Sequence, residues 1–236
     1  MIKSRFKNFC SSLLAKKGRR IVRLPLAHYL KQFEIDCVLD VGANIGQYGS
    51  SLRKLGYRGP IESFEPMTSA FSDLTKASHS DAKWTAFNYA LGNEETSSEL
   101  NLSANGPSSS FLEMSDNVKD TGVDLDYVGS ETVHVHRLDS VFREVVGPAK
   151  NVFLKIDTQG FERSVIQGAK KSLDKIRAVQ MEVALVAHYE GEALIEEMLG
   201  MMRERGFDPW WVHHGFRHHS TFQMIQVDLF FVRRNS

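Results

Sequence analysis

From Asp36 onward, short apolar runs rich in β-branched residues alternate with longer segments in which apolar residues recur at helical spacing. This alternation is typical of a parallel sheet covered by helices on both faces, so the sequence predicts an α/β fold. The expected strands are Cys37–Val41, Ile61–Phe64, Trp84–Ala90, Val152–Ile156, Ala178–Val183, Trp210–His213 and Gln226–Val232. Seven strands are enough for one complete doubly wound domain.

Helices are expected in four segments, which are Gly46–Leu55, Ser69–Ala77, Glu162–Lys171 and Glu192–Arg205. Gly206 follows the fourth segment directly and is expected to end it, because glycine readily adopts the left-handed conformation of a helix C-terminus. A polar loop without a helix joins the last two strands. The final strand is therefore expected to run antiparallel at the edge of the sheet.

Between Glu94 and Thr132 the periodic pattern gives way to Ser, Asn, Gly and Asp, including the segment Asn105–Ser110. A long irregular stretch within a compact domain is usually a lid or a binding loop. A tolerated surface insertion would have the same composition, so both interpretations stay open.

The N-terminus is strongly basic. Nine of the 29 Lys and Arg residues precede Glu34, whereas no acidic residue does, and apolar residues from Ile2 to Leu13 recur at helical spacing. Such a helix could lie on an anionic membrane, although a solvated helix packed on the domain and a mitochondrial presequence fit the same pattern. We divide the chain into a basic, amphipathic helical extension (1–33) and one domain (34–236).

Composition excludes several classes of protein. The formal net charge is zero and 42% of the residues are hydrophobic, so we expect a folded domain and no nucleic-acid partner. No apolar run approaches the roughly 18 residues that span a bilayer. Two cysteines, Cys10 and Cys37, cannot form a disulfide framework or a cysteine-based zinc site. These features predict a cytoplasmic protein, at the membrane periphery if the N-terminal helix binds lipid.

A glycine turn follows the first strand. Asp40 and Val41 lead into Gly42, Asn44 and Gly46, after which a helix begins. This order lets backbone amides at a helix N-terminus approach a ligand. The dinucleotide fingerprint G-x-G-x-x-G would need a second glycine where Asn44 stands, so the turn favours a cofactor with an aminoacyl group over a pyrophosphate. Asp40 and Asn44 are candidate contacts to that cofactor.

Glu65 ends the second strand, nineteen residues beyond Gly46. Doubly wound folds place a carboxylate at this position to bind the hydroxyls of a ribose. A glycine turn alone is a weak signal, but the turn followed by an acid at this interval is much stronger.

Several sequence blocks resemble those of the FkbM-type methyltransferases, from about Cys37 to Arg233. The matching blocks are Val38–Tyr48 (VLDVGANIGQY), Phe64–Pro66, Ala90–Gly92, Phe153–Glu162 (FLKIDTQGFE), the Leu138–Asp139 step and Gln226–Arg233. The fourth block is the most specific, because the first occurs in many methyltransferases.

The resemblance implies a class I Rossmann-like methyltransferase with helices on both faces of its sheet and S-adenosyl-L-methionine as cofactor. It implies methylation of a hydroxyl on a small molecule or glycan, that is, a sugar, polysaccharide or secondary metabolite. Methyltransferases of this architecture contact the adenine ring at the end of the third strand, where Asn88 and Ala90 are the candidates. The same two residues could equally form an ordinary strand end and turn.

Alternation along the strand Val152–Ile156 places Lys155 and Asp157 on one face. A lysine in a central parallel strand needs a partner, which Asp157 or Glu182 could supply. Because ligands bind at the carboxyl ends of such strands, Asp157 is the first candidate for the base or the acceptor-orienting group. A purely structural Lys155–Asp157 ion pair is the alternative.

Histidines give weaker signals. Glu182, at the end of the fifth strand, or His188, in the loop that follows it, could assist in catalysis, although loop histidines are more often surface residues. The segment His213–His219 matches no zinc signature, so a solvated hairpin is expected there. A divalent ion held by Asp157 and Glu182 is compatible with the spacing, but nothing requires it, and no metal site is predicted.

Two other functions remain open from the sequence. A strand, a glycine turn, a helix and a strand-end acid also serve NAD(P)-dependent oxidoreductases, although Asn44 weakens that interpretation. A non-catalytic descendant could retain the fold as an interaction module. The intact set of Asp40, Glu65, Lys155 and Asp157 argues against such a module.

Overall fold

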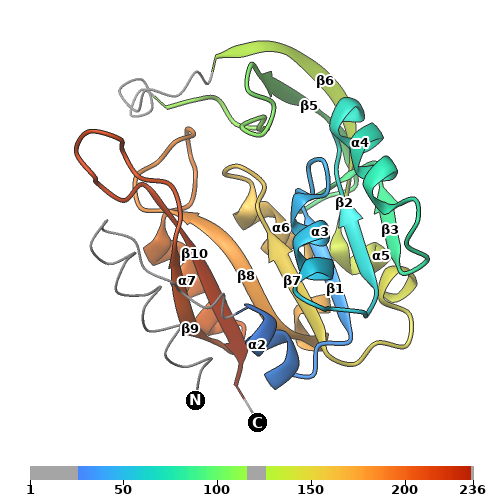
Figure 1. The fold of residues 1–236 in the computed structure, drawn as a ribbon. Helices are drawn as coiled ribbons and strands as arrows, with labels where there is room; N and C mark the ends of the chain where they lie inside the picture. The colour runs from blue at the N-terminus through green and yellow to red at the C-terminus, as the bar shows by residue number, and fades with distance from the viewer. Residues whose placement is uncertain (1–25, 116–125, 235–236) are drawn as a thin grey trace, which may run out of the picture.

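The computed structural model describes residues 26–115 and 126–234. Its central sheet has seven strands in the order β3-β2-β1-β7-β8-β10-β9 (Figure 1). The strands are β1 (Cys37–Val41), β2 (Ile61–Phe64), β3 (Trp84–Phe87), β7 (Val152–Ile156), β8 (Ile176–Ala184), β9 (Phe207–His214) and β10 (Gln226–Arg233). β10 runs antiparallel to both of its neighbours, while β3, β2, β1, β7 and β8 are parallel. The predicted α/β class, with a mostly parallel seven-stranded sheet and an antiparallel last strand, is confirmed.

The position of the last strand differs from the prediction. β10 lies between β8 and β9 rather than at the edge of the sheet. The physical reason is its apolar composition: six of its eight residues are buried, so it needs a neighbour on each side. β9 takes the edge instead and exposes most of its side chains.

Helices cover both faces of the sheet. One apolar cluster joins α5 (Leu138–Val146), α6 (Glu162–Gly168) and α7 (Ile195–Glu204) to one face. A second joins α2 (Leu26–Gln32), α3 (Gln47–Lys54) and α4 (Thr68–Ser78) to the other. The four predicted helices are present with shifted ends, and α5 was not predicted. α2 lies within the helical extension expected over residues 1–33, although no helix was placed at its own residues. The helix predicted to reach Lys171 ends at Gly168 and is followed by a 3₁₀ turn over Ser172–Lys175.

A second, three-stranded sheet follows β3. It has the order β4-β6-β5 and consists of β4 (Ala90–Leu91), β5 (Thr96–Ser103) and β6 (Tyr127–His136). The strand predicted over Trp84–Ala90 is thus divided between the two sheets. The β5–β6 ribbon arches over the end of the central sheet toward which β2 and β7 point (Figure 1). We call residues 96–115, from β5 to the end of the first described range, the insert.

The N-terminal helix expected over residues 2–13 lies outside the described residues. α2, which begins the described residues, packs against the sheet. The ring of Tyr29 lies 5.8 Å from that of Trp211 and 6.2 Å from that of Phe230. In the described ranges, no helix has the length and apolar character needed to cross a bilayer.

Candidate active site

A cavity of about 420 Å³ opens at the carboxyl ends of β1, β2 and β7, where ligands bind in open α/β sheets. Of the predicted site residues, six line it: Gly42, Asn44, Glu65, Ala90, Lys155 and Asp157. The other predicted residues lie outside its wall, and their positions reveal what each one does.

The glycine turn packs against the end of β7. Gly42 has a φ of +73°, and a Cβ there would lie 1.8 Å from the main-chain oxygen of Asp157. A side chain at this position would therefore collide with the protein itself, in addition to narrowing the cavity. Because Gly42 has no side chain, the loop after β1 can pack directly against the end of β7.

Gly46 does not line the cavity, and its role is at the start of α3. It adopts the left-handed conformation as the N-cap of α3, and a Cβ there would lie 3.1 Å from Leu74 and 3.2 Å from Trp84. The close approach of α3 to α4 and β3 requires a residue without a side chain. Gln47 and Tyr48, in the first turn of α3, line the cavity. The first N–H groups of a helix have no partner within it, so this turn can bind an anionic group.

Asn44 connects the turn to the second strand. It has a φ of +49°, a conformation that asparagine tolerates better than most residues, and its backbone N–H donates to Oε2 of Glu65 at 2.8 Å. The backbone N–H of Met67 donates to Oε1 of Glu65 at 2.9 Å. Burial raises the pKa of Glu65, while these two bonds act in the opposite direction. Each carboxylate oxygen keeps a further acceptor site for a ligand hydroxyl.

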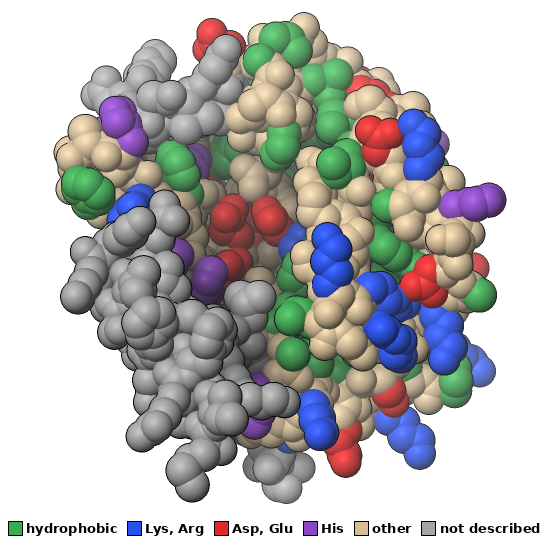
Figure 2. Space-filling model, in the orientation of Figure 1, with side chains coloured by type: hydrophobic (Ala, Val, Ile, Leu, Met, Phe, Trp, Pro, Cys, Tyr) green, Lys and Arg blue, Asp and Glu red, His purple; other side chains and the backbone are tan. Residues whose placement is uncertain are grey.

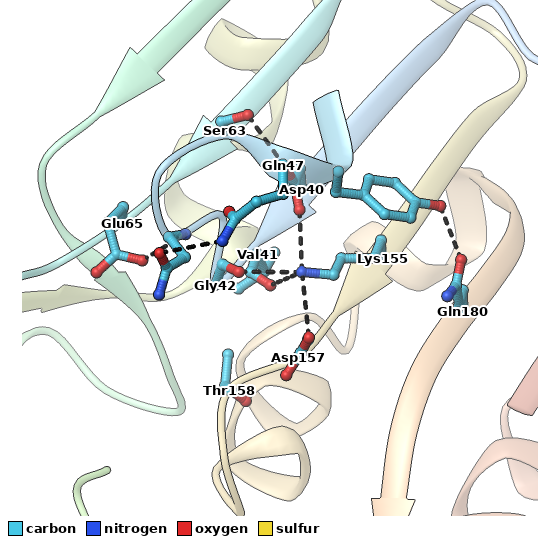
Figure 3. A network of polar contacts seen from close by, with 12 residues as sticks. Asp40, Val41, Gly42, Gln47, Ser63, Glu65, Lys155, Asp157, Thr158 and Gln180 are labelled. Atoms are coloured by element: carbon cyan, nitrogen blue, oxygen red, sulfur yellow. Dashed lines mark hydrogen bonds and ion pairs between the residues drawn. The ribbon is translucent and has the colours of Figure 1, made fainter. Parts of the chain in front are cut away.

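Asp40 and Lys155 form a buried ion pair on the face that α3 covers. Lys155 Nζ lies 3.1 Å from Oδ1 of Asp40, which is the nearest carboxylate, and 3.8 Å from Oδ2 of Asp157. It also donates to the main-chain oxygens of Val41 (3.4 Å) and Gly42 (3.0 Å), as Figure 3 shows. Burial alone would lower the pKa of Lys155, but Asp40, Asp157 and Glu182 raise it above its ordinary value.

The sequence prediction that Lys155 pairs with Asp157 is thus confirmed, whereas a direct pair with Glu182 is wrong. Asp40 is fully buried and does not line the cavity. Its carboxylate faces Lys155 and Ser63, with Ser63 Oγ donating at 3.4 Å. Lys155 links Asp40 to the carbonyls of the glycine turn, and the expectation from the sequence that Asp40 receives the cofactor's ammonium through water stays a prediction.

Asp157 and Glu182 are held together by one amide. Nε2 of Gln159 donates to Oδ1 of Asp157 at 2.9 Å and to Oε2 of Glu182 at 3.2 Å. The Asp157 side chain is 41% exposed and lines the cavity, whereas Glu182 does not line it. Burial, followed by the nearby carboxylates of Asp157, Glu162 and Asp228, raises the pKa of Glu182 well above its ordinary value. Figure 2 shows acidic side chains gathered in a hollow of this face, beside a basic one.

A row of polar side chains continues across the sheet beyond Lys155. The Tyr48 hydroxyl donates to Oε1 of Gln180 at 2.7 Å, and Nε2 of Gln180 donates to Oδ1 of Asp228 at 3.3 Å. Nδ1 of His213 lies 3.4 Å from Oδ2 of Asp228. Sequence reasoning did not identify this row, although the register pairs Lys155 with Gln180 and Asp228 with His213.

His188 lies outside the cavity wall. It is 7% exposed, and its Nε2 has no hydrogen-bond partner among the described residues. Burial lowers its pKa, and its ring packs 5.8 Å from that of Phe216. A neutral, enclosed imidazole fits a packing role better than the predicted assisting role.

The two adenine candidates differ. Ala90 is buried and lines the cavity. Asn88 does not line it, because its side-chain amide donates to the main-chain oxygens of Glu65 and Pro66, both at 3.0 Å. Asn88 therefore holds the turn that carries Glu65.

The insert contributes one wall of the cavity. Leu100, Gly106, Pro107, Ser109 and Phe111 line it. Of the two interpretations left open by the sequence, a lid or binding loop agrees with this position better than a surface insertion. The change in amino-acid composition located this segment in the sequence, but it did not indicate which of its residues face the cavity.

No set of three or more His, Cys, Asp or Glu side chains suited to a metal ion occurs within residues 26–115 and 126–234. Between Asp157 and Glu182 lies the amide nitrogen of Gln159, which donates hydrogen bonds and does not bind cations. The histidine-rich segment after β9 forms a hairpin closed by a bridge between Arg217 and Met224.

The family model of the methyltransferase FkbM domain matches residues 40–209. No curated protein matches the chain at a significant level. Among solved structures, the chain is similar to methyltransferase FkbM from Methylobacillus flagellatus, with a TM-score of 0.47 and 11% identity over 83% of this chain and 44% of that one. The chain thus spans less than half the length of that protein.

Two further similar structures contain bound S-adenosyl-L-methionine. Fibrillarin from Aeropyrum pernix has a TM-score of 0.47 and 12% identity, over 84% of this chain and 66% of that one. Magnesium protoporphyrin IX methyltransferase from Synechocystis has a TM-score of 0.48 and 10% identity, over 99% and 82%.

Proposed function

The chain belongs to the FkbM methyltransferase family, and we propose that it transfers a methyl group from S-adenosyl-L-methionine to a hydroxyl of a sugar, polysaccharide or secondary metabolite. The observation that carries the proposal is the joining of the glycine turn to Glu65. Asn44 donates its N–H to this carboxylate at the wall of the cavity, 2.8 Å away.

The residues of the cavity suit this cofactor. Its volume of about 420 Å³ lies within the range of small-molecule sites. Glu65 offers two oxygens to a ribose diol, and the first turn of α3 offers N–H groups to an amino-acid carboxylate. Leu100, Phe111 and Ala90 all line the cavity and supply apolar surface of the kind that a purine ring requires.

When bound, S-adenosyl-L-methionine supplies an electrophilic methyl group on a sulfonium. The protein's part is to align the acceptor, exclude water and remove a proton. We assign the proton to Oδ2 of Asp157, because Oδ1 is engaged by Gln159 while the side chain borders the cavity. Lys155 keeps the negative charge of Asp157 compensated at 3.8 Å and holds the glycine turn by its carbonyls.

The position of the insert supports a role for this segment in enclosing the reacting groups. Its loop borders the same cavity as the glycine turn, so acceptor and cofactor would be sheltered from bulk water beneath it. Acceptor choice would then depend on this loop and on the acidic residues around Asp157.

The experiment is an acceptor screen with a radiolabelled methyl donor, beginning with sugars and glycan extracts. We expect label to appear in a hydroxyl-bearing acceptor as an ether that survives mild base. Label found only in amines or in nucleic acid would contradict the proposed acceptor class.

A further inference from the structure

The Gln159 side chain lines the cavity and uses both of its hydrogen-bond donors and its carbonyl oxygen there. A glutamine amide has two N–H donors and one carbonyl oxygen. The donors reach Asp157 (2.9 Å) and Glu182 (3.2 Å), and the oxygen accepts from the Tyr189 hydroxyl at 3.0 Å. The opposite orientation of the amide would turn its oxygen toward two carboxylates, so the contacts determine which end is nitrogen.

The backbone of Gln159 occupies an unfavourable conformation. Its φ is +54°, in the left-handed region, which is unfavourable for a residue with a Cβ. Such conformations persist where the surroundings impose them, and they cluster at functional sites. Here the main-chain oxygen of Gln159 accepts a hydrogen bond from Ser110 Oγ at 2.6 Å, which ties the residue to the insert.

The two carboxylates need the amide between them. The negative charges of Asp157, Glu162 and Asp228 repel the Glu182 carboxylate. The positive charge of Lys155 acts in the opposite direction. Lys155 is itself engaged by Asp40 and by two carbonyls of the glycine turn. A donor placed between Asp157 and Glu182 therefore decides how these carboxylates are oriented.

Gln159 also joins the carboxylates to the loop that borders the cavity. Tyr189, which donates to its side chain, lies 3.2 Å from the main-chain oxygen of Ser108 through the same hydroxyl. Ser110 donates to its main chain. One residue thus connects the ends of β7 and β8 with the insert.

We propose that Gln159 is a positioning residue, which holds Asp157 by Oδ1 so that Oδ2, beside Lys155, is left to take the acceptor's proton, and which links that orientation to the placement of the 106–111 loop. The reaction part of this inference rests on the proposed function. The hydrogen-bond part does not.

The first test is therefore spectroscopic and needs no acceptor. In the ¹H–¹⁵N spectrum of the full chain, assigned by its loss in Gln159→Glu, both side-chain amide protons of Gln159 are expected downfield and slow to exchange. Asp157→Asn should return one proton to the ordinary region, and Glu182→Gln the other. The proposal would be overturned if both amide protons had ordinary chemical shifts, exchanged fast and responded to neither substitution.

The second test separates positioning from packing. Gln159→Glu has the same shape but loses both donors, so turnover should fall at least tenfold while the affinity for S-adenosylhomocysteine stays within about twofold. Its activity relative to wild type should rise as the pH falls, because protonation of the introduced carboxylate restores one hydrogen-bond donor. The charged groups that surround this position are Asp157, Glu182, Lys155, Asp40, Glu162 and Asp228. Gln167→Glu, on the exposed side of α6, is the matched control and should leave turnover unchanged.

Gln159→Gly guards against a folding artefact. It relieves the left-handed backbone and keeps the main-chain acceptor for Ser110, which offsets part of the cost of the lost side-chain contacts, so the variant should melt cooperatively and still lose turnover. Wild-type turnover in Gln159→Glu or Gln159→Gly would overturn the positioning role. Absence of methyl transfer by the wild type would instead count against the proposed function and leave the spectroscopic result standing.

Discussion

The backbone N–H of Asn44 donates to Oε2 of Glu65 across 2.8 Å, so the turn after the first strand and the acid at the end of the second form one unit. The two residues are 21 positions apart. The bond explains why a glycine is not needed at position 44: asparagine tolerates the left-handed backbone that directs this N–H toward the acid.

Glu65→Ala is expected to weaken binding of S-adenosylhomocysteine at least tenfold. The substitution removes both acceptors for a ribose diol and leaves the N–H groups of Asn44 and Met67 without their partner. Calorimetric titration measures the effect. Glu94→Ala, at an exposed glutamate outside the cavity, serves as the control and should bind as the wild type does. Equal affinity in both variants would remove Glu65 from the binding site.

Asp157→Asn should abolish turnover while leaving the affinity for S-adenosylhomocysteine near that of the wild type. General base catalysis contributes about 10²–10⁴-fold, and asparagine keeps the shape but cannot take the proton. Initial rates with the acceptor found in the screen, alongside calorimetry, check this. Full activity in Asp157→Asn would reassign the base to another group.

Lys155→Met should destabilise the fold by about 3–5 kcal/mol, because it leaves the fully buried Asp40 without its cation. The double substitution Lys155→Met with Asp40→Asn should recover part of that loss, since neither charge then remains. Urea unfolding measures both. A Lys155→Met variant as stable as the wild type would show that the ion pair is not needed for folding.

Glu162 gives the fold a pH dependence. Burial is the main cause that raises its pKa from 4.5 to about 7, with Glu192 and Asp157 adding to it and the N–H groups of Thr158 and Glu162 opposing it. Between these two values the folded state binds the proton more tightly than the unfolded state does. The contribution of Glu162 to stability is therefore present below about pH 4.5 and is lost as the pH rises toward 7.

Glu162→Gln should consequently gain stability relative to the wild type over that window, on the order of 2–3 kcal/mol by pH 8, with little difference at pH 4. Thermal unfolding at a series of pH values follows this difference. A constant difference across the whole series would rule out titration of Glu162 as the cause.

The parts of the fold that the sequence predicted are those whose signal is local. Cys37–Val41 and Val152–Ile156 are buried at every residue, and each is apolar apart from one charged residue, Asp40 or Lys155. Thr96–Ser103 has only two buried residues and carries Ser, Glu and Asn, so no apolar pattern indicates a strand. Its pairing with β6 depends on residues about thirty positions away.

The same distinction holds at the site. The glycine turn and Glu65 are recognisable because their spacing is fixed by one βαβ unit. Gln159 contacts Glu182, Tyr189 and Ser110, which are 23, 30 and 49 positions away, and its role appears only when the chain is folded. Asp40 was predicted as a cofactor contact, and only the structure shows that it is buried behind the cavity wall with Lys155 as its partner.

Calorimetric titration of the full chain with S-adenosylhomocysteine and, separately, with NAD tests the central claim most directly. We expect saturable binding of S-adenosylhomocysteine at one site, its loss in Glu65→Ala, and no binding of NAD. Tight binding of NAD without binding of S-adenosylhomocysteine would contradict this claim.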